Sequence, residues 1–314
     1  MNVESKTKLA EFSKFTIGHT GFQKAIGIIH QSFEATRLRG EPACAMLLGE
    51  SGTGKTRICD HVMSEFKPQK TVHDEAGIQT IRPVVYCRIP DKVTVKGVVV
   101  ALLNAFEAHR SYSSFTSLDY RLQRLLETNK TEFIVIDEWQ HTARVGATAT
   151  QKSICDWMKV LSDFFKGGIM LSGTPEFEKI IALHPGLDGR FPYRARLEPF
   201  SLASPEKQGE YLGLLSAFNA EIQSKMAFSD MAALTDETNA LALYVLTKGN
   251  LRALRTWLFA ALREALERAD GNLTRRDFSI AAQLIQKDQR LTMDDPFNLN
   301  LAHLRKLIMS NNSK

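Results

Sequence analysis

One glycine-rich segment has the residue types and spacing that bind phosphate. It consists of Gly49, Glu50, Ser51, Gly52, Thr53, Gly54, Lys55 and Thr56, which match the pattern GxxxxGK followed by Ser or Thr. Glycines let consecutive backbone N–H groups face one phosphate, and a following helix adds the partial positive charge of its N-terminus. We expect ATP here, with Lys55 on the β- and γ-phosphates, Thr56 on Mg²⁺ and Arg57 beside the nucleotide. A chance glycine-rich turn is the alternative.

Two adjacent carboxylates end an apolar run further along the chain. Asp137 and Glu138 follow residues 133–136, which are all apolar and read as a buried strand. In a nucleotide hydrolase of this kind the first acid holds Mg²⁺ through water, and the second orients and activates the attacking water. The sequence therefore predicts Asp137 as a metal ligand and Glu138 as the catalytic base. Two solvated acids at a strand end are the alternative.

Polar and basic residues at three later positions complete a candidate ATPase site. Ser172 and Thr174 end another apolar run, where a hydroxyl could orient the water; a plain turn is the alternative, and the sequence does not choose between the two hydroxyls. Arg190, with Arg194 in reserve, could stabilise charge on the phosphoryl group of a neighbouring subunit. Arg252, with Arg255 as the alternative, could reach the nucleotide from a later helix. Ordinary surface arginines are the competing interpretation.

The segments between these motifs predict an α/β domain followed by helices. Strand candidates at 43–48, 83–89, 133–136, 169–172 and 194–197 alternate with helix-like stretches, which favours a mostly parallel five-stranded sheet. No convincing strand follows residue 200. Ser204 and Pro205 start a helix, Gly271 is expected to end another, and Thr274 with Asp277 resembles a capping box. We expect an N-terminal helical segment (1–40), a nucleotide-binding domain (41–200), a helical domain (201–290) and a tail (291–314).

Composition limits the class of protein. The chain has 314 residues, 44% hydrophobic and 24% charged, as a folded globular protein should. The four cysteines lie far apart, without the spacing of a zinc site or a disulfide framework, so we expect them buried and reduced. No apolar run reaches the roughly 18 residues of a membrane span, and the N-terminus lacks a signal peptide pattern, so we expect a cytoplasmic protein. A net charge of +5 permits nucleic-acid binding without demonstrating it.

The order of these motifs resembles that of an AAA+ ATPase of the initiator-like branch, over residues 20 to 290. More closely, the chain resembles the TniB/TnsC family of transposition regulators, which is related to MuB. The residues that carry the likeness are 39–42 (RGEP), 47–56 (LLGESGTGKT), 136–141 (IDEWQH), 173–176 (GTPE) and 189–191 (GRF). The resemblance implies an α/β P-loop AAA+ (ASCE) fold, in which helices sandwich a parallel five-stranded sheet and a small α-helical lid follows.

The same resemblance implies a function. Such a protein forms rings or filaments on double-stranded DNA with ATP and Mg²⁺, and recruits and activates a DDE transposase. It acts downstream of a target-selection protein such as a CRISPR-associated adaptor, and ATP hydrolysis disassembles the complex. Family members place DNA-tracking residues after the second strand, where Lys92, Thr94 and Lys96 are candidates; the loop that carries Arg144 and Lys152 could line the same channel. Solvated helix starts are the alternative.

Two other classes of ATPase share the nucleotide motifs. An AAA+ ATPase of secretion or signalling would carry a membrane or envelope segment or a sensor domain, for which the sequence shows no pattern. A clamp-loader or replication-initiator relative would usually carry a winged helix after the lid, and only about 24 residues follow Arg290. The transposition regulator is therefore the preferred hypothesis.

Overall fold

The structure is a computed structural model that describes residues 1–74, 77–91, 93–107, 114–144, 148–285 and 290–312. The chain divides into two units. Residues 21–198 form an α/β unit, and residues 1–20 join residues 199–314 in a helical unit. The segment 1–40 that the sequence groups together is thus shared between the units, because its two helices pack into separate cores.

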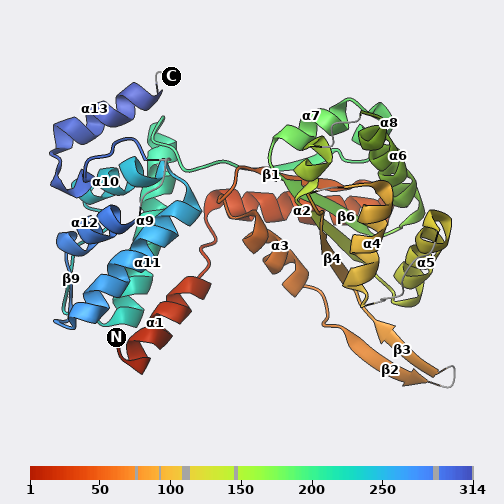
Figure 1. The fold of residues 1–314 in the computed structure, drawn as a ribbon, viewed down its shortest axis with the longest axis horizontal. Coiled ribbons are helices and arrows are strands. Elements are labelled where there is room, and N and C mark those ends of the chain that lie inside the picture. Colours follow the sequence, from red (N-terminus) through yellow and green to blue (C-terminus); the bar gives the residue numbers. More distant parts are fainter. Residues whose placement is uncertain (75–76, 92, 108–113, 145–147, 286–289, 313–314) are drawn as a thin grey trace. The chain divides into compact units, whose positions relative to one another are not determined.

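A parallel sheet is the centre of the α/β unit (Figure 1). Its strands are β1 (Ala45–Gly49), β4 (Val84–Arg88), β5 (Phe133–Asp137), β6 (Gly168–Gly173) and β7 (Tyr193–Leu197). Their order is β4-β5-β6-β1-β7, and all four pairings are parallel. The predicted five-stranded parallel sheet is therefore confirmed, and the ends of each strand lie within two residues of those of its predicted segment. Strand β6 separates β1 from β5, so the two phosphate-site motifs lie on non-adjacent strands.

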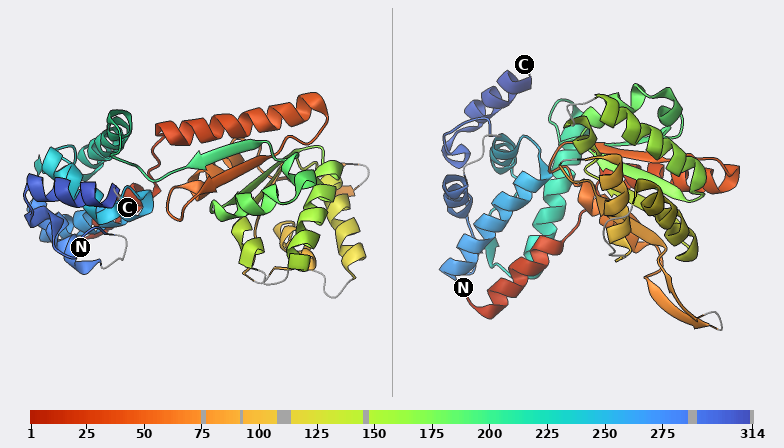
Figure 2. Two further views of the ribbon diagram at one scale, coloured as in Figure 1. Left: turned by 90° about the horizontal axis from the view of Figure 1, so that it is seen from above. Right: turned by 45° about the vertical axis from the view of Figure 1, so that its right-hand side comes forward.

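Helices cover both faces of this sheet, as Figure 2 shows from above. Alternate strand residues such as Leu47, Val135 and Met170 pack with α2 (Thr20–Arg39) and α3 (Lys55–Ser64). The other residues of the same strands, such as Leu48 and Ile136, pack on the opposite face. The elements of that layer are α4 (Val95–Ala105), α5 (Phe115–Thr128), η1 (Trp139–Arg144), α6 (Thr148–Phe164), α7 (Glu176–Ala182) and α8 (Pro185–Asp188). Because both faces are covered, the central strands are uniformly apolar rather than alternating.

An antiparallel hairpin was not anticipated from the sequence. It consists of β2 (Lys70–Asp74) and β3 (Gly77–Ile81), and it extends from the α/β unit between α3 and β4 (Figure 1). Its strands mix polar and apolar residues, and within the described ranges they pair only with each other. Without a core-facing apolar run, the segment carried no strand signal.

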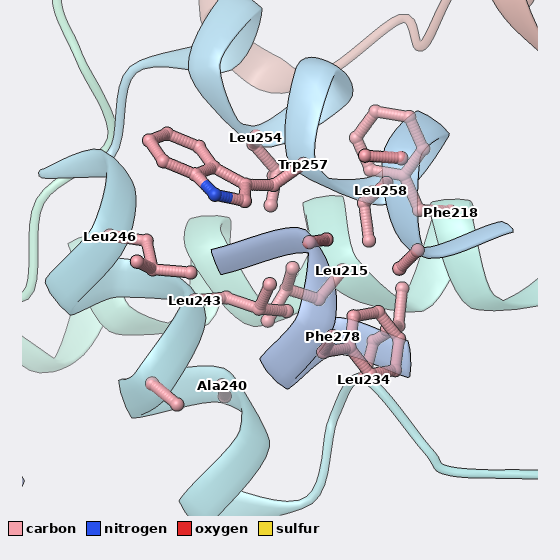
Figure 3. Close-up of a cluster of buried hydrophobic side chains, with 14 of the residues drawn as sticks. Leu215, Phe218, Leu234, Ala240, Leu243, Leu246, Leu254, Trp257, Leu258 and Phe278 are labelled. Carbon is pink, nitrogen blue, oxygen red and sulfur yellow. The ribbon is translucent and has the colours of Figure 1, made fainter. Parts of the chain in front are cut away.

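The helical unit is built around one apolar core (Figure 3). Its elements are α1 (Val3–Lys14), α9 (Pro205–Met226), β8 (Asp230–Met231), α10 (Glu237–Thr247), α11 (Leu251–Arg268), β9 (Asn272–Leu273), α12 (Arg275–Leu284), η2 (Pro296–Asn298) and α13 (Leu301–Asn312). Trp257 and Phe218 lie in this core together with leucines of α9, α10 and α11. In the described part of the chain no helix is both long enough and apolar enough to cross a membrane.

The helix ends in this unit follow the expected capping chemistry with one exception. Ser204 caps α9 with Pro205 in the first turn, and Thr274 with Asp277 forms the capping box of α12. The prediction that Gly271 ends α11 was wrong: Ala269, with φ at +58°, takes the left-handed position and donates its N–H to Ala265 O. Gly271 lies two residues further on.

All four cysteines are free and buried, as expected.

Candidate functional site

The glycine-rich loop joins β1 to α3, at the carboxyl edge of the sheet. Gly52 and Gly54 have φ values of +87° and +107°, a conformation that side chains rarely adopt. A Cβ on Gly49 would lie 2.6 Å from Thr53 Oγ1 and 2.7 Å from the Leu197 carbonyl oxygen. The loop therefore needs glycine at these positions to expose its backbone.

The lysine and threonine of the motif lie in the first turn of α3. Lys55 Nζ donates to the carbonyl oxygens of Gly49, at 2.5 Å, and Glu50, at 3.0 Å. The ammonium group is thus held over the loop that would surround a phosphate. Thr56 and Arg57 are exposed at the same helix start. These groups fit a nucleoside triphosphate, because a cation, backbone donors and a helix N-terminus converge there.

Asp137 lies at the end of β5, two strands from the loop. It is 5% exposed, and its Oδ2 accepts a hydrogen bond from Tyr86 Oη at 3.1 Å. Burial, together with the negative charge of Asp137, raises the pKa of the Cys59 thiol to about 12. Since Cys59 lies on α3, Asp137 is close to the helix that begins with Lys55.

A magnesium ion would fit between the start of α3 and the end of β5. The Thr56 hydroxyl and the Asp137 carboxylate are hard oxygen ligands of the kind that Mg²⁺ prefers. Among the residues that the structure describes, no three His, Cys, Asp or Glu side chains are grouped to hold a metal by themselves. The remaining ligands would therefore be phosphate oxygens and water.

Glu138 has an unusual backbone. Its φ is +60°, in the left-handed region, and its N–H donates to Asp137 Oδ1 at 2.9 Å. Arg88, at the end of β4, contacts Glu138 Oε1 at 3.0 Å. The other carboxylate oxygen, Oε2, accepts from the Gln140 side-chain amide and lies 4.0 Å from His141 Nε2. The carboxylate is thus restrained on both oxygens, at a position where the backbone itself is strained.

The two candidate hydroxyl residues occupy different environments. Ser172 is fully buried at the end of β6, and its hydroxyl has no hydrogen-bond partner among the residues that the structure describes. Thr174 is half-buried, and its backbone N–H donates to Gln140 Oε1 at 3.2 Å. Because Ile136 pairs with Leu171, the ends of β5 and β6 lie side by side. The residues that join these strand ends, Gln140 above all, could not be recognised as site residues from the sequence, since a glutamine after an acid pair has no site pattern of its own.

The arginines near β7 make ion pairs within the subunit. The Arg190 guanidinium contacts both carboxylate oxygens of Asp163, at 2.6 and 2.7 Å, and it lowers the pKa of that carboxyl. Arg190 O accepts from the Cys44 N–H, which places this residue at the amino edge of the sheet, opposite the phosphate loop. Arg194 pairs with Asp188 and with Glu178.

Arg252 and Arg255 lie on α11 in the helical unit, and the structure gives them different surroundings. Arg252 is exposed in the first turn of the helix, which Asn250 caps. Arg255 is half-buried and donates to the carbonyl oxygens of Phe12, Ser13 and Phe15 at the end of α1. Arg255 therefore holds the N-terminal helix on its own unit, which leaves Arg252 as the candidate lid residue.

The candidate DNA contacts are partly described. Thr94 caps α4 by accepting from the Gly97 N–H at 3.0 Å, and Lys96 is exposed in the first turn of that helix. Lys152 is exposed on α6. Lys92 lies outside the described residues, as does the side chain of Arg144, whose backbone belongs to η1. Thr94 and Lys96 follow β4, so they lie toward the same edge of the sheet as the phosphate loop.

Comparisons with known proteins bear on the family and the fold of the chain. A family model described as "Bacterial TniB protein" matches residues 10–202. The solved Aeropyrum pernix ORC1 protein in complex with DNA has a TM-score of 0.58 and 17% identity, over 83% of this chain and 65% of that one. The solved Aeropyrum pernix ORC2 protein in ADPNP–ADP complexes has a TM-score of 0.59 and 12% identity, over 92% of this chain and 79% of that one. At these identities the likeness is one of fold.

One curated sequence also matches. The genome polyprotein of Ectropis obliqua picorna-like virus is 30% identical over 79 residues, which are 25% of this chain and 2% of the polyprotein. The chain thus spans a small part of that relative and slightly under two thirds of the ORC1 protein.

Proposed function

Because the chain belongs to the bacterial TniB family and has the P-loop fold of AAA+ ATPases, we propose that it is an ATP-hydrolysing regulator of DNA transposition. It assembles on double-stranded target DNA with ATP and Mg²⁺, and links a target-selection protein to a DDE transposase. ATP hydrolysis then disassembles the assembly. These functions are those of the transposition regulators that the chain resembles.

The observation that carries the proposal is the acid pair that follows β5. Glu138 sits in a left-handed conformation directly after the buried Asp137, and side chains restrain both oxygens of its carboxylate. A left-handed non-glycine residue costs on the order of 1–2 kcal/mol, so a fold that keeps one benefits from the position of its side chain. A general base is a group for which that position matters.

The residues divide the chemistry among them. Bound ATP with Mg²⁺ supplies the γ-phosphoryl group and neutralises part of its charge. Lys55 and the loop N–H groups hold the phosphates, while Thr56 and Asp137 provide oxygen ligands. Glu138 accepts a proton from a water as the water oxygen bonds to the γ-phosphorus. The bond to the leaving ADP oxygen breaks in the same displacement, and Ser172 or Thr174 orients the water.

Assembly supplies the remaining groups. Arg190 acts on the nucleotide of a neighbouring subunit, after exchanging its Asp163 contact for the phosphoryl group. Arg252 reaches the nucleotide from the lid. Thr94, Lys96 and Lys152, with Lys92 and Arg144, contact DNA phosphates, so binding is largely independent of base sequence. The ORC1 protein of the same fold, whose structure is a complex with DNA, supports this choice of partner.

Electron microscopy with parallel sedimentation tests the proposal. The samples contain the protein with and without double-stranded DNA and a non-hydrolysable ATP analogue. Rings or filaments should form only when both are present, and Lys55→Ala should abolish them. Lys225→Ala, which removes an exposed lysine of α9, serves as the matched control and should assemble normally. Assembly driven by the analogue alone and unchanged by DNA would instead favour a protein partner, as in the secretion or signalling ATPases.

The DNA interface has a separate test in the salt dependence of binding. Removing one lysine that neutralises a DNA phosphate should reduce the slope of log K against log salt by about 1. Lys96→Ala should therefore lower both affinity and slope on any DNA sequence, whereas Lys225→Ala should change neither. Equal slopes for Lys96→Ala and the unmodified protein would remove α4 from the DNA interface.

A further inference from the structure

Gln140 links the ends of two neighbouring strands inside the α/β unit. Its side-chain amide donates to Glu138 Oε2, and its side-chain oxygen accepts from the Thr174 N–H at 3.2 Å. One side chain thus connects the carboxylate that follows β5 to the loop that follows β6. The residue is 7% exposed, so water does not compete freely for either hydrogen bond.

The loop after β6 is shaped around this amide. A Cβ on Gly173 would lie 2.4 Å from Gln140 Oε1, and its next neighbour would be a ring carbon of Phe177 at 2.9 Å. The glutamine therefore occupies space that any other residue at 173 would fill. Close packing of this kind fixes the amide in one position, and the amide fixes the group to which it donates.

Glu138 needs such a restraint. The backbone at Glu138 is in the left-handed region, and Arg88 holds only the other carboxylate oxygen, from an exposed side chain. Exposed ion pairs contribute little to holding a group in place. The buried Gln140 amide is the stronger restraint on this carboxylate.

We propose that Gln140 is a positioning residue for ATP hydrolysis, which fixes Glu138 Oε2 and couples it to the strand end that carries Ser172 and Thr174. The inference rests on the proposed function, since it needs Glu138 as the base. A displacement of the β6 loop would move the Gln140 amide and with it the carboxylate. The opposing interpretation is that Gln140 only fills space beside Gly173.

Two variants of Gln140 separate these interpretations. Gln140→Met keeps the length of the side chain and removes both hydrogen bonds. Gln140→Glu keeps an acceptor for Thr174 and replaces the amide donor to Glu138 with a second carboxyl group. Each should lower the single-turnover rate of ATP hydrolysis about 10- to 100-fold, because small misplacements of a catalytic group cost that much. Binding of a fluorescent ATP analogue should stay within about twofold, since no residue on the phosphates has changed.

The matched control is Gln123→Met. Gln123 also donates to a carboxylate, Asp119 at 3.1 Å, and it lies on α5 in the same unit. Its replacement should leave the hydrolysis rate unchanged. If Gln140→Met lowered the melting temperature strongly, Gln140→Glu would carry the test, because it preserves the packing and the Thr174 contact.

A double-mutant cycle gives the decisive readout. In a Glu138→Gln background, Gln140→Met should cause no further loss, because a positioning residue acts only through the group that it positions. Full additivity of the two losses, or an unchanged rate for both Gln140 variants, would overturn the inference while leaving Glu138 as the base. Normal turnover of Glu138→Gln by itself would overturn the base assignment first, and the two failures are therefore distinct.

Discussion

The two units of the molecule use left-handed backbone differently. Six described non-glycine residues have positive φ, and three of them belong to the helical unit. These are Ala227, Lys248 and Ala269, each of which ends a helix. In the α/β unit, Glu107 and Lys130 directly follow the C-caps of α4 and α5. Glu138 is the one described residue of this set that follows a strand.

Buried polar groups show the same contrast. In the helical unit the buried Asp277 belongs to the capping box of α12 and so completes local structure. In the α/β unit the buried Asp137, Gln140 and Ser172 gather where β5 and β6 end, next to the strained Glu138. Asp277 thus satisfies a helix start, whereas Asp137 and Gln140 both hydrogen-bond with Glu138. The difference indicates that the α/β unit gives up local stability for geometry, as functional sites do.

The largest effect is expected from Glu138→Gln. The variant keeps the size of the side chain and removes the base, so kcat should fall by about 10²- to 10⁴-fold. The melting temperature should hardly change, since the replaced carboxylate is a partly exposed group. Steady-state ATPase assays and calorimetry measure the two quantities, with Glu127→Gln on the exposed side of α5 as the control. A kcat within twofold of the unmodified protein would contradict Glu138 as the base, and with it the contrast between the two units.

The next effect belongs to the core of the helical unit. Trp257→Ala should destabilise this unit by about 3–5 kcal/mol, because it empties a fully buried position of Figure 3. Phe259→Ala on the same helix should cost far less, since Phe259 is 36% exposed. Chemical denaturation monitored by circular dichroism compares the two variants. Equal losses would show that burial does not govern stability in this unit.

Arg255→Met should release the N-terminal helix. The three hydrogen bonds to carbonyl oxygens of residues 12–15 involve a charged donor, for which about 2 kcal/mol is a reasonable total. Hydrogen exchange of the α1 amides should then accelerate about 30-fold. Arg252→Met is the matched control on the same helix and should leave α1 protected. Acceleration in both variants would contradict the assignment of Arg255 to α1 alone.

The smallest effect tests the strain itself. Glu138→Gly should be more stable than Glu138→Ala by about 1 kcal/mol, because glycine adopts a positive φ without steric cost. Ala269→Gly should gain a similar amount at the end of α11. Thermal denaturation measures the gains, and ATPase assays should show activity kept only by Ala269→Gly. A Glu138→Gly variant no more stable than Glu138→Ala would mean that the backbone there is not strained.

Much of the α/β unit could be predicted from the sequence. Strands β1, β5 and β6 are largely continuous apolar runs, and such patterns are short-range. The phosphate loop follows the same logic, because the turn and helix that the motif requires are encoded within eight residues. The hairpin of β2 and β3 and the end of α11 at Ala269 were missed. In both places the local residue types are ordinary, and pairing or packing decides the backbone.

The sequence by itself determined the parallel sheet, the phosphate loop and the acid pair, since each is a local pattern of residue types. Only the tertiary structure decided which side chains meet. It brought Gln140 between Glu138 and Thr174. It also brought the guanidinium of Arg255 into contact with carbonyl oxygens at the end of α1. Thirty-four residues separate Gln140 from Thr174 and 242 separate Arg255 from Ser13. Contacts over such separations depend on how strands pair and helices pack, which no short pattern records.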